Sequence, residues 1–206
     1  MNEAKTIFDA DGLSSQERYR LLIGLVVPRP IGWIGTRAED GRRNLAPYSF
    51  FNMVAGTPPT VLFSPGRRGG AAKDSLRNVL ATGEFTVNMV DERLAEAMNH
   101  TSGEYGPEVD EFELAGLDSG SGQVVDAPLV MASPANLECT LLQTVDLGVP
   151  ATNTVVFGQI ERIHVRTDLL DGTRVDPHGL RAVGRLAGSG YTRTVDGYFE
   201  MKRPTS

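Results

Sequence analysis

The sequence predicts a mainly β protein that forms a small barrel with a few short peripheral helices. Glycine and proline are frequent, at 23 and 12 of the 206 residues, which is typical of a β-rich fold with many turns. Residues 28–51 have the composition of two strands around a tight turn. Two long segments of alternating apolar character, residues 137–147 and 154–166, follow each other along the chain. Such a succession of strands favours a meander that closes into a barrel.

Residues 28–51 are the stretch around which we expect the rest of the chain to be organised. Residues 31–36 are rich in β-branched and aromatic side chains, and Asp40-Gly41 is a strong turn signal. Residues 44–51 run back with Pro47 inside them, so this strand should lie at a sheet edge and be bulged or broken near Pro47. A broken edge beside hydroxyls and aromatic rings suits a flat heterocycle with polar edges. A plain hairpin with a buried aromatic pair is the alternative.

A second signal is a basic, glycine-rich loop that leads into a helix. The loop over residues 65–72 is followed by Lys73, Asp74 and a helix over residues 75–81, which ends at Gly83. A helix N-terminus offers free N–H groups and a partial positive charge, and the adjacent cations add full charges. The pattern therefore predicts an anion site, most simply for a phosphate. A solvated basic loop with Asp74 as an ordinary N-cap is the alternative.

Local patterns predict the elements at the start of the chain and after the hairpin. Ser14 or Ser15 should cap a short helix with one buried apolar face. Residues 60–64 are nearly all apolar and predict a strand buried on both faces, whereas residues 84–90 alternate and predict a half-buried strand. The apolar face of the first helix consists of Tyr19, Leu22 and Ile23.

The second half of the chain contains one helix signal, one long loop and the two long strands. Asp91 should cap a helix over residues 92–99, and residues 101–125 show no clear element except a helical turn near residues 110–114. Loops of this length are usually functional. The apolar side chains of residues 154–166 change parity, which indicates a bulge near residues 158–161. Cys139 lies on an apolar strand face and is predicted to be a core residue.

Composition limits the class of protein and its surroundings. The length and apolar content fit a single globular domain over residues 1–206, with residues 1–13 as a flexible arm. A net charge of −6 argues against binding to nucleic acid or to an anionic membrane. No apolar run approaches the roughly 20 residues of a spanning helix, and the polar N-terminus does not resemble a signal peptide. A lone cysteine rules out an internal disulfide, so we expect a cytoplasmic protein.

Several common chemistries lack their sequence signatures. The chain contains no G-x-G-x-x-G after a strand, no phosphate-loop motif G-x-x-x-x-G-K-[ST], no G-x-S-x-G and no H-E-x-x-H. His100, His164 and His178 are far apart, without carboxylates at metal-ligand spacing. We therefore predict no metal site. Trp33, the single tryptophan, is expected in the core, with a place beside a ligand as the alternative.

In their order and spacing, these motifs resemble the flavin reductase–like family, the FMN-binding split barrels. The branch that they resemble most includes nitrilotriacetate monooxygenase component B. The resemblance runs from Tyr19 to Arg193. It is carried by the stretch over residues 28–51, by Ser64 to Ser75, and by three later segments, Gly83-Glu-Phe-Thr-Val-Asn88, Met98-Asn-His-Thr101 and Val109-Asp-Glu-Phe112.

The resemblance implies a split β-barrel that forms a homodimer, with FMN bound near the interface and FAD as an alternative cofactor. Arg67, Lys73 and Ser75 are then expected to hold the phosphate, and the sequence leaves open whether Arg67 or Arg68 contacts it. Asn99 and Tyr191 are expected to approach the flavin ring. The ribityl chain and the ring edge would be lined by Thr36, Asn44, Ala46, Ser49 and Phe50, and the set is completed by Pro47, Tyr48, Ser64 and Asp74.

The activity that the resemblance implies is a flavin reductase that transfers hydride from NAD(P)H to flavin. No catalytic side chain is needed, because the flavin N5 atom receives the hydride and the protein supplies orientation and electrostatics. The reduced flavin would be supplied to a partner monooxygenase. One alternative is a non-enzymatic FMN-binding redox carrier on the same fold, and another is a barrel that acts as an interaction module with an empty site. The sequence does not choose between NADH and NADPH.

Overall fold

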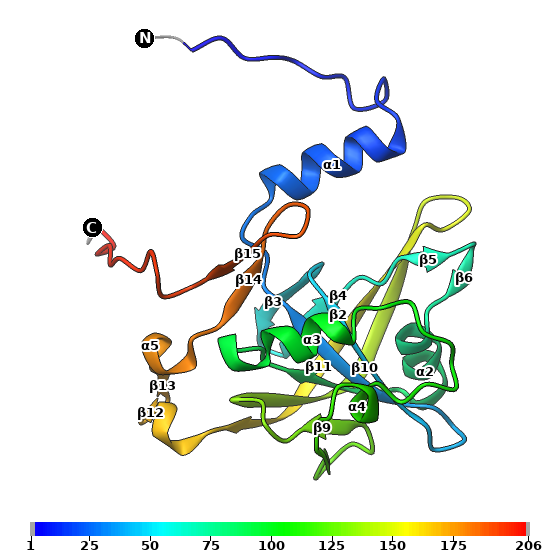
Figure 1. The fold of residues 1–206 in the computed structure, drawn as a ribbon, viewed down its shortest axis with the longest axis vertical. Coiled ribbons are helices and arrows are strands. Elements are labelled where there is room, and N and C mark those ends of the chain that lie inside the picture. The colour runs from blue at the N-terminus through cyan, green and yellow to red at the C-terminus, as the bar shows by residue number, and fades with distance from the viewer. Residues whose placement is uncertain (1–2, 205–206) are drawn as a thin grey trace.

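The computed structural model describes residues 3–204, and its central feature is one seven-stranded antiparallel sheet (Figure 1). The strands follow each other in the order β2-β1-β7-β10-β11-β4-β3. Their bounds, in chain order, are β1 (Gly32–Arg37), β2 (Arg43–Tyr48), β3 (Phe51–Gly56), β4 (Pro59–Phe63), β7 (Glu84–Asn88), β10 (Ala135–Leu147) and β11 (Asn153–Val165).

Short helices and two-stranded ribbons surround this sheet. The helices are α1 (Ser15–Leu25), α2 (Asp74–Thr82), α3 (Ala95–His100), α4 (Glu111–Leu114) and α5 (Pro177–Leu180), with 3₁₀ turns η1 (Glu92–Leu94) and η2 (Thr167–Leu169). The ribbons pair β5 (Arg67–Arg68) with β6 (Ala71–Ala72), β8 (Ser119–Ser121) with β9 (Pro128–Val130), β12 (Leu170–Asp171) with β13 (Arg174–Val175), and β14 (Val183–Arg185) with β15 (Tyr191–Arg193). The predicted mainly β class is confirmed.

The two edge strands of the sheet, β2 and β3, are consecutive in the chain. Only Ser49 and Phe50 separate them, and Phe50 accepts a hydrogen bond from the Ser64 N–H at 2.8 Å. The predicted break in the edge strand is therefore present, although it lies after Tyr48. Pro47 itself pairs in regular register with Trp33, because β2 has one sheet neighbour and needs no donor on its outer side. The interruption between the edges is the split of the barrel.

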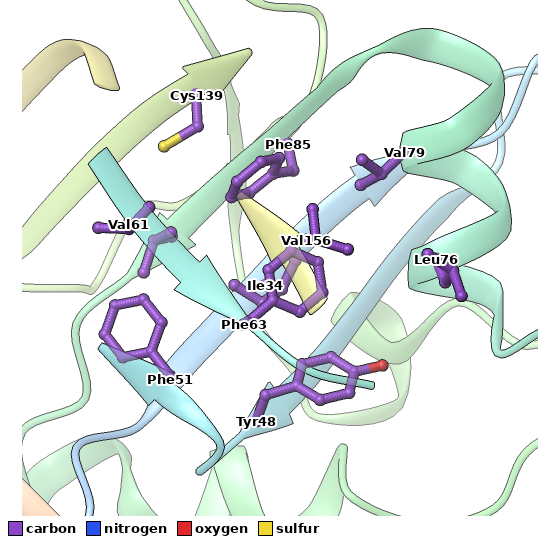
Figure 2. Close-up of a cluster of buried hydrophobic side chains, with 11 residues drawn as sticks. Ile34, Tyr48, Phe51, Val61, Phe63, Leu76, Val79, Phe85, Cys139 and Val156 are labelled. Atoms are coloured by element: carbon purple, nitrogen blue, oxygen red, sulfur yellow. The ribbon is translucent and has the colours of Figure 1, made fainter. Parts of the chain in front are cut away.

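The interior of the barrel is a continuous apolar cluster (Figure 2). The Tyr48 and Phe85 rings each lie 5.2 Å from the Phe63 ring, centroid to centroid. Leu76 and Val79 add the inner face of α2 to this cluster. Cys139 is fully buried on its wall, and burial raises the pKa of the thiol, so the sulfur is an inert core atom as predicted.

A long strand must approach this core closely at Gly158. A Cβ atom added there would lie 2.2 Å from Cζ of Phe85, whose ring is itself fully buried. We expect Gly158→Ala to lower the free energy of unfolding by about 1–3 kcal/mol, because the core has no room for the methyl group. Chemical denaturation measures the loss. Gly56→Ala, at a strand position with open space around it, is the matched control. Equal stability of the two variants would contradict the expectation.

Both long strands carry an irregularity that lets the sheet curl. The register between β10 and β11 shifts between Glu138 and Cys139, which leaves Glu161 as an extra residue on β11. This confirms the predicted bulge over residues 158–161. A second shift leaves Leu142 unpaired on β10. Bulges bend a strand and increase its twist, which a small barrel requires.

A second apolar cluster lies on the other face of the sheet, under α3 and α4. Trp33 is fully buried in it, and its indole N–H donates to Thr101 Oγ1 at 2.9 Å, so this ring is a core residue as predicted. Asp91 accepts from the N–H groups of Arg93 and Leu94, which confirms the predicted cap. The remaining members of the cluster are Ile31, Leu45, Val90, Met98, Phe112, Val130 and Val183, together with Leu94.

Two sequence predictions about burial are wrong. Strand β7 is buried on both faces, because β9 covers its outer side, where Thr86 Oγ1 donates to the Pro128 carbonyl at 2.6 Å. Helix α1 has the predicted Ser14 cap, completed by Glu17, but none of its residues is buried. It extends away from the sheet at the top of Figure 1, and Tyr19 and Leu22 are 56% and 53% exposed. A helix packs its apolar face only where the fold brings a surface to it.

The long loop before β10 is held by one buried carboxylate, Glu138. Its Oε2 accepts from the N–H groups of Gln123, Val124 and Val125 at 2.7–3.0 Å, and its Oε1 lies 2.6 Å from Nε2 of His164. Burial by itself raises the pKa of Glu138, but these hydrogen bonds outweigh burial and lower the pKa to about 2. The His164 side chain is partly exposed and reaches back to this carboxylate.

No helix within residues 3–204 has the length and apolar character needed to cross a bilayer. Over the same residues, histidine, cysteine and carboxylate side chains form no group of three or more that would hold a metal ion.

Candidate functional site

A pocket of about 290 Å³ lies between the end of β2, the start of α2 and the loop that follows α3. Its walls contain half of the residues predicted to contact a cofactor: Asn44, Ala46, Pro47, Tyr48, Lys73, Asp74 and Ser75. The fold thus brings the broken edge strand and the predicted anion helix to the same place. The opposite wall consists of residues 101–107 and Glu111.

A larger hollow of about 570 Å³ lies elsewhere, beside the end of β11. Its cations are already engaged: Arg93 pairs with Asp91 at 2.6 Å and Arg166 with Asp168 at 2.7 Å. His164 is held by Glu138. The start of α2 and the end of β2, next to the strand break, both line the smaller pocket, so we assign the candidate site to that pocket.

The N-terminus of α2 has no side-chain cap. Lys73 occupies the N-cap position, and a lysine side chain cannot accept a hydrogen bond from the first-turn N–H groups. Asp74 is the first helical residue rather than the cap, and its carboxylate pairs with Arg77 one turn later. Lys73 and Arg77 both line the pocket, beside the uncapped N–H groups. This arrangement matches the binding requirements of an anion such as a phosphate.

A chain of hydrogen bonds runs behind the pocket and connects α2 with α4. The Tyr48 hydroxyl donates to Ser75 Oγ at 3.1 Å, and Ser75 Oγ donates to Asn44 Oδ1 at 2.8 Å. The Asn44 amide then donates to Glu111 Oε1 at 2.9 Å, and the Leu45 N–H donates to Glu111 Oε2 at 3.0 Å. Burial raises the pKa of Tyr48 to about 12, against the opposing effect of its bond to Ser75, so its hydroxyl remains a donor.

Glu111 is the unusual member of this chain. It is buried, and burial is the main reason that its pKa is raised, against the hydrogen bond from Leu45. It accepts both of its hydrogen bonds from the edge strand β2 and thereby fixes the strand against α4. Glu111 belongs to the family-like segment Val109-Asp-Glu-Phe112, and no role was predicted for it from the sequence. Arg77 was also missed, although its position three residues after Asp74 on a helix indicates the ion pair.

The structure places the other predicted residues outside the pocket. Thr36 is fully buried behind it and contacts Asn44 and Asn78. Arg67 donates to Asp146 and Thr154 at 3.1 Å each, on the far side of the β5–β6 ribbon. The Arg68 side chain lies outside the described part of the structure, so a contact between Arg68 and the phosphate stays a prediction.

The remaining predicted residues lie around the split. Ser49 and Phe50 form the interruption itself, and the Ser49 hydroxyl accepts from Arg29 Nε at 3.3 Å. Ser64 follows β4 and closes the split by its bond to Phe50. Asn99 and Tyr191 do meet, because the Tyr191 hydroxyl donates to Asn99 Oδ1 at 3.1 Å, but neither lines the pocket.

Comparison with known proteins identifies the family. The model of the flavin reductase like domain matches residues 24–179, which is most of the chain. This chain belongs to the flavin reductase–like family. Members of this family bind flavin, and their name and fold indicate an oxidoreductase.

Individual relatives cover nearly the whole of this flavin reductase–like chain. A protein of Deinococcus radiodurans, whose name gives no function, is 42% identical over 97% of this chain and 90% of its own length. Nitrilotriacetate monooxygenase component B from Bacillus cereus is 32% identical, with a TM-score of 0.94 over 97% of this chain and all of that one. The 2-nitrobenzoate 2-nitroreductase of Pseudomonas fluorescens is 33% identical, with a TM-score of 0.88 and 97% coverage of both chains. The split-barrel prediction is confirmed.

Proposed function

We propose that this protein is an NAD(P)H:flavin oxidoreductase that binds FMN and passes hydride from a reduced nicotinamide to the flavin. The observation that carries the proposal is the uncapped N-terminus of α2, flanked by Lys73 and Arg77, in one pocket with the broken edge strand. A phosphate suits the helix end, and the exposed backbone of the break suits the polar edge of an isoalloxazine ring.

In this proposal the pocket and the strand break beside it each hold a part of FMN. Lys73, Arg77 and the first-turn N–H groups of α2 hold the phosphate, with Ser75 adding a hydroxyl. Asn44 and Ala46 line the ribityl chain, and the backbone at Ser49 and Phe50 meets the ring edge. The bound flavin supplies the chemistry, since its N5 atom accepts the hydride from the nicotinamide. FAD, with the same phosphoribityl end, is the alternative ligand.

The protein itself supplies orientation and charge rather than an acid or base. Arg29 is buried and has no carboxylate partner in the described part of the chain; it donates to Ser49 and to the carbonyls of Ile23, Val26 and Leu186. A buried cation behind the strand break favours negative charge near that edge. This is the charge that a reduced flavin carries, so the electrostatics support reduction at this position.

We also propose a homodimer. Helix α1 presents apolar side chains to solvent, with Leu25 at 75% exposure and Val26 at 59%, and Met53 on edge strand β3 is 63% exposed. A monomer rarely leaves such a helix uncovered. A second copy would cover it, and Tyr191 would then lie near the ring from one side of the interface. Light scattering of the purified protein tests this, and a monomer at micromolar concentration would overturn it.

The proposal also covers the partner proteins and the cellular compartment of this protein. The similarity to a monooxygenase component supports a partner monooxygenase that receives reduced flavin. The single buried cysteine is compatible with a reducing compartment, and we propose the cytoplasm. The net charge of −6 gives no reason to expect nucleic acid as a partner.

The test of the proposed activity is an anaerobic absorbance titration. Purified protein should bind added FMN, and the flavin bands should bleach when NADH or NADPH is supplied, faster than in a sample without protein. Binding of FMN without bleaching would overturn the reductase and leave the redox carrier. Absence of FMN and FAD binding would overturn both and leave a barrel that acts as an interaction module.

A second candidate function follows from the similarity to the Pseudomonas fluorescens nitroreductase at 33% identity. In that case the site would also admit a nitroaromatic acid, and the bound flavin would supply the electrons for its reduction. The same titration separates the two, because 2-nitrobenzoate added to the bleached complex would restore the flavin bands without oxygen. Bands that stay bleached would exclude this acceptor.

A further inference from the structure

The hydrogen-bond chain behind the pocket ends at a buried carboxylate that has no cation. Glu111 is 6% exposed, and none of the described lysine, arginine or histidine side chains forms an ion pair with it. Arg43, on the facing strand, is held by Asp110 at 2.5 Å and by Glu113 at 3.4 Å. An isolated buried carboxylate is costly when ionised, and taking up a proton removes the cost.

Other charged groups around the pocket make the ionised form less favourable still. Asp74 adds a negative charge from the start of α2, and it contributes to the raised pKa of Glu111 after the effect of burial. Its partner Arg77 lies beside it, and Glu104 lies on the loop that forms the opposite wall. An anion bound at α2 would bring further negative charge close to Glu111. The remaining titratable side chains that line the pocket are Lys73, Tyr105 and Tyr48, and burial raises the pKa of Tyr48 so that it stays neutral.

With Glu111 ionised, the direction of every bond in the chain is fixed. The carboxylate can only accept, so the Asn44 amide must point its NH₂ group toward Glu111 and its oxygen toward Ser75. Ser75 therefore gives its single proton to Asn44 Oδ1. Ser75 lines the pocket, but its hydroxyl has no proton left for a ligand.

We propose that binding of an anion at the start of α2 reverses this chain, with Glu111 taking up one proton. The proton comes from solvent through the pocket. The protonated Glu111 donates to Asn44 Oδ1, and its other oxygen still accepts from the Leu45 N–H. The Asn44 amide turns over and donates to Ser75 Oγ, so Ser75 is free to donate its proton to the anion. Glu111 is thus a positioning residue that acts on the ligand through Asn44 and Ser75.

In the reversed chain every buried side chain keeps at least one hydrogen-bond partner. Ser75 Oγ has two lone pairs, which accept from Asn44 and from the Tyr48 hydroxyl. Thr36 Oγ1 accepts from the Asn78 amide at 3.0 Å and donates weakly to Asn44 Oδ1 at 3.4 Å. In the reversed chain it accepts from both amides and loses only the weak bond that it donates. The two states differ by one proton and by the orientation of one amide. The inference rests on the proposed function, because it assumes that the anion is the phosphate of the flavin.

The test compares the wild type with Glu111→Gln, which copies the protonated state. A glutamine amide donates to Asn44 Oδ1 while its oxygen accepts from the Leu45 N–H. We expect Glu111→Gln to bind FMN about 10- to 100-fold more tightly than the wild type at pH 8 and to approach the wild type near pH 6. One proton changes the affinity at most about ten-fold per pH unit, which is about a hundred-fold over these two units. Riboflavin, which lacks the phosphate, should bind equally to both proteins.

Two more variants make the experiment specific. Glu113→Gln, on the same helix but 79% exposed at its side chain, should behave as the wild type. Ser75→Ala added to Glu111→Gln should remove the gain in FMN affinity. The inference would be overturned if the FMN affinities of the wild type and Glu111→Gln depended on pH in the same way, or if riboflavin gained as much affinity as FMN in Glu111→Gln. Either result would leave the proposed function standing. Failure of all variants to bind FMN would overturn the proposed function, and the inference with it.

A second measurement does not depend on any variant. Titration calorimetry of the wild type in two buffers with different ionisation enthalpies counts the protons exchanged on binding. At pH 7 we expect net uptake with FMN and none with riboflavin. A cationic site acting on the phosphate alone would release protons, since it favours the dianion. Release or no exchange with FMN would therefore overturn the inference.

Discussion

Replacement of Glu138 by alanine is expected to lower the free energy of unfolding by about 3–5 kcal/mol, because it removes a buried acceptor and leaves the groups that donate to it without a hydrogen-bond partner. Three backbone N–H groups, of Gln123, Val124 and Val125, and the ring of His164 would lose their common partner. The loss is a large share of the 5–15 kcal/mol of a typical domain. Denaturant titration measures it, and Gln143→Ala, at an exposed position of the same strand, is the control.

The same carboxylate predicts a loss of stability in acid. Its pKa is lowered to about 2 in the folded protein, from an ordinary value of 4.5, so the unfolded chain takes up the proton first. The stabilisation is complete above about pH 5 and is lost as the pH falls toward 2, with a total of about 3 kcal/mol. Glu138→Ala should lack this component. An identical acid dependence in the two proteins would show that Glu138 is not the responsible group.

Replacement of Lys73 by alanine is the second large expected effect, this time on binding. We expect FMN affinity to fall about 10- to 100-fold, because a charge-assisted bond to the phosphate is worth about 1.5–3 kcal/mol. Riboflavin affinity should change by less than about two-fold. Flavin fluorescence quenching measures both ligands, and the loss for FMN should shrink as salt is raised, since Lys73 is exposed.

Arg67→Ala is the matched control for Lys73→Ala. Both residues were predicted from the sequence to hold the phosphate, but the structure places the Arg67 guanidinium on Asp146 and Thr154. We therefore expect Arg67→Ala to leave FMN affinity nearly unchanged. An equal loss in both variants would mean that Arg67 leaves its present partners when flavin binds, and an unchanged Lys73→Ala would remove the phosphate from the start of α2.

Local sequence signals were sufficient to predict a structural feature wherever that feature depends on residues close together in the chain. The Asp40-Gly41 turn, the Ser14 and Asp91 caps and the glycine stop of α2 all formed as predicted, and Gly83 indeed adopts a positive φ of 73°. Alternation identified β10 and β11, the bulge at Glu161 and the burial of Cys139. The family followed from the order of these short motifs along the chain.

Predictions failed where an outcome depends on what packs against an element. The apolar face of α1 looks like a buried face, yet no described segment of the chain covers it. The alternating pattern of β7 predicted one solvent-exposed face, but residues of β9 pack against that face and bury it. Periodicity reports how a side chain is oriented on its own element. Periodicity carries no information about which surface of the protein the fold places against that element.

The site shows the same division. The sequence alone determined that an edge strand breaks near Pro47 and that a basic loop leads into a helix, because both depend on neighbouring residues. Only the tertiary structure decided that the two meet in one pocket, that Arg77 rather than Arg67 faces it, and that Glu111 holds Asn44 across a separation of 67 residues. The physical reason is that barrel closure sets contacts between distant residues, whereas backbone preferences act only along the chain.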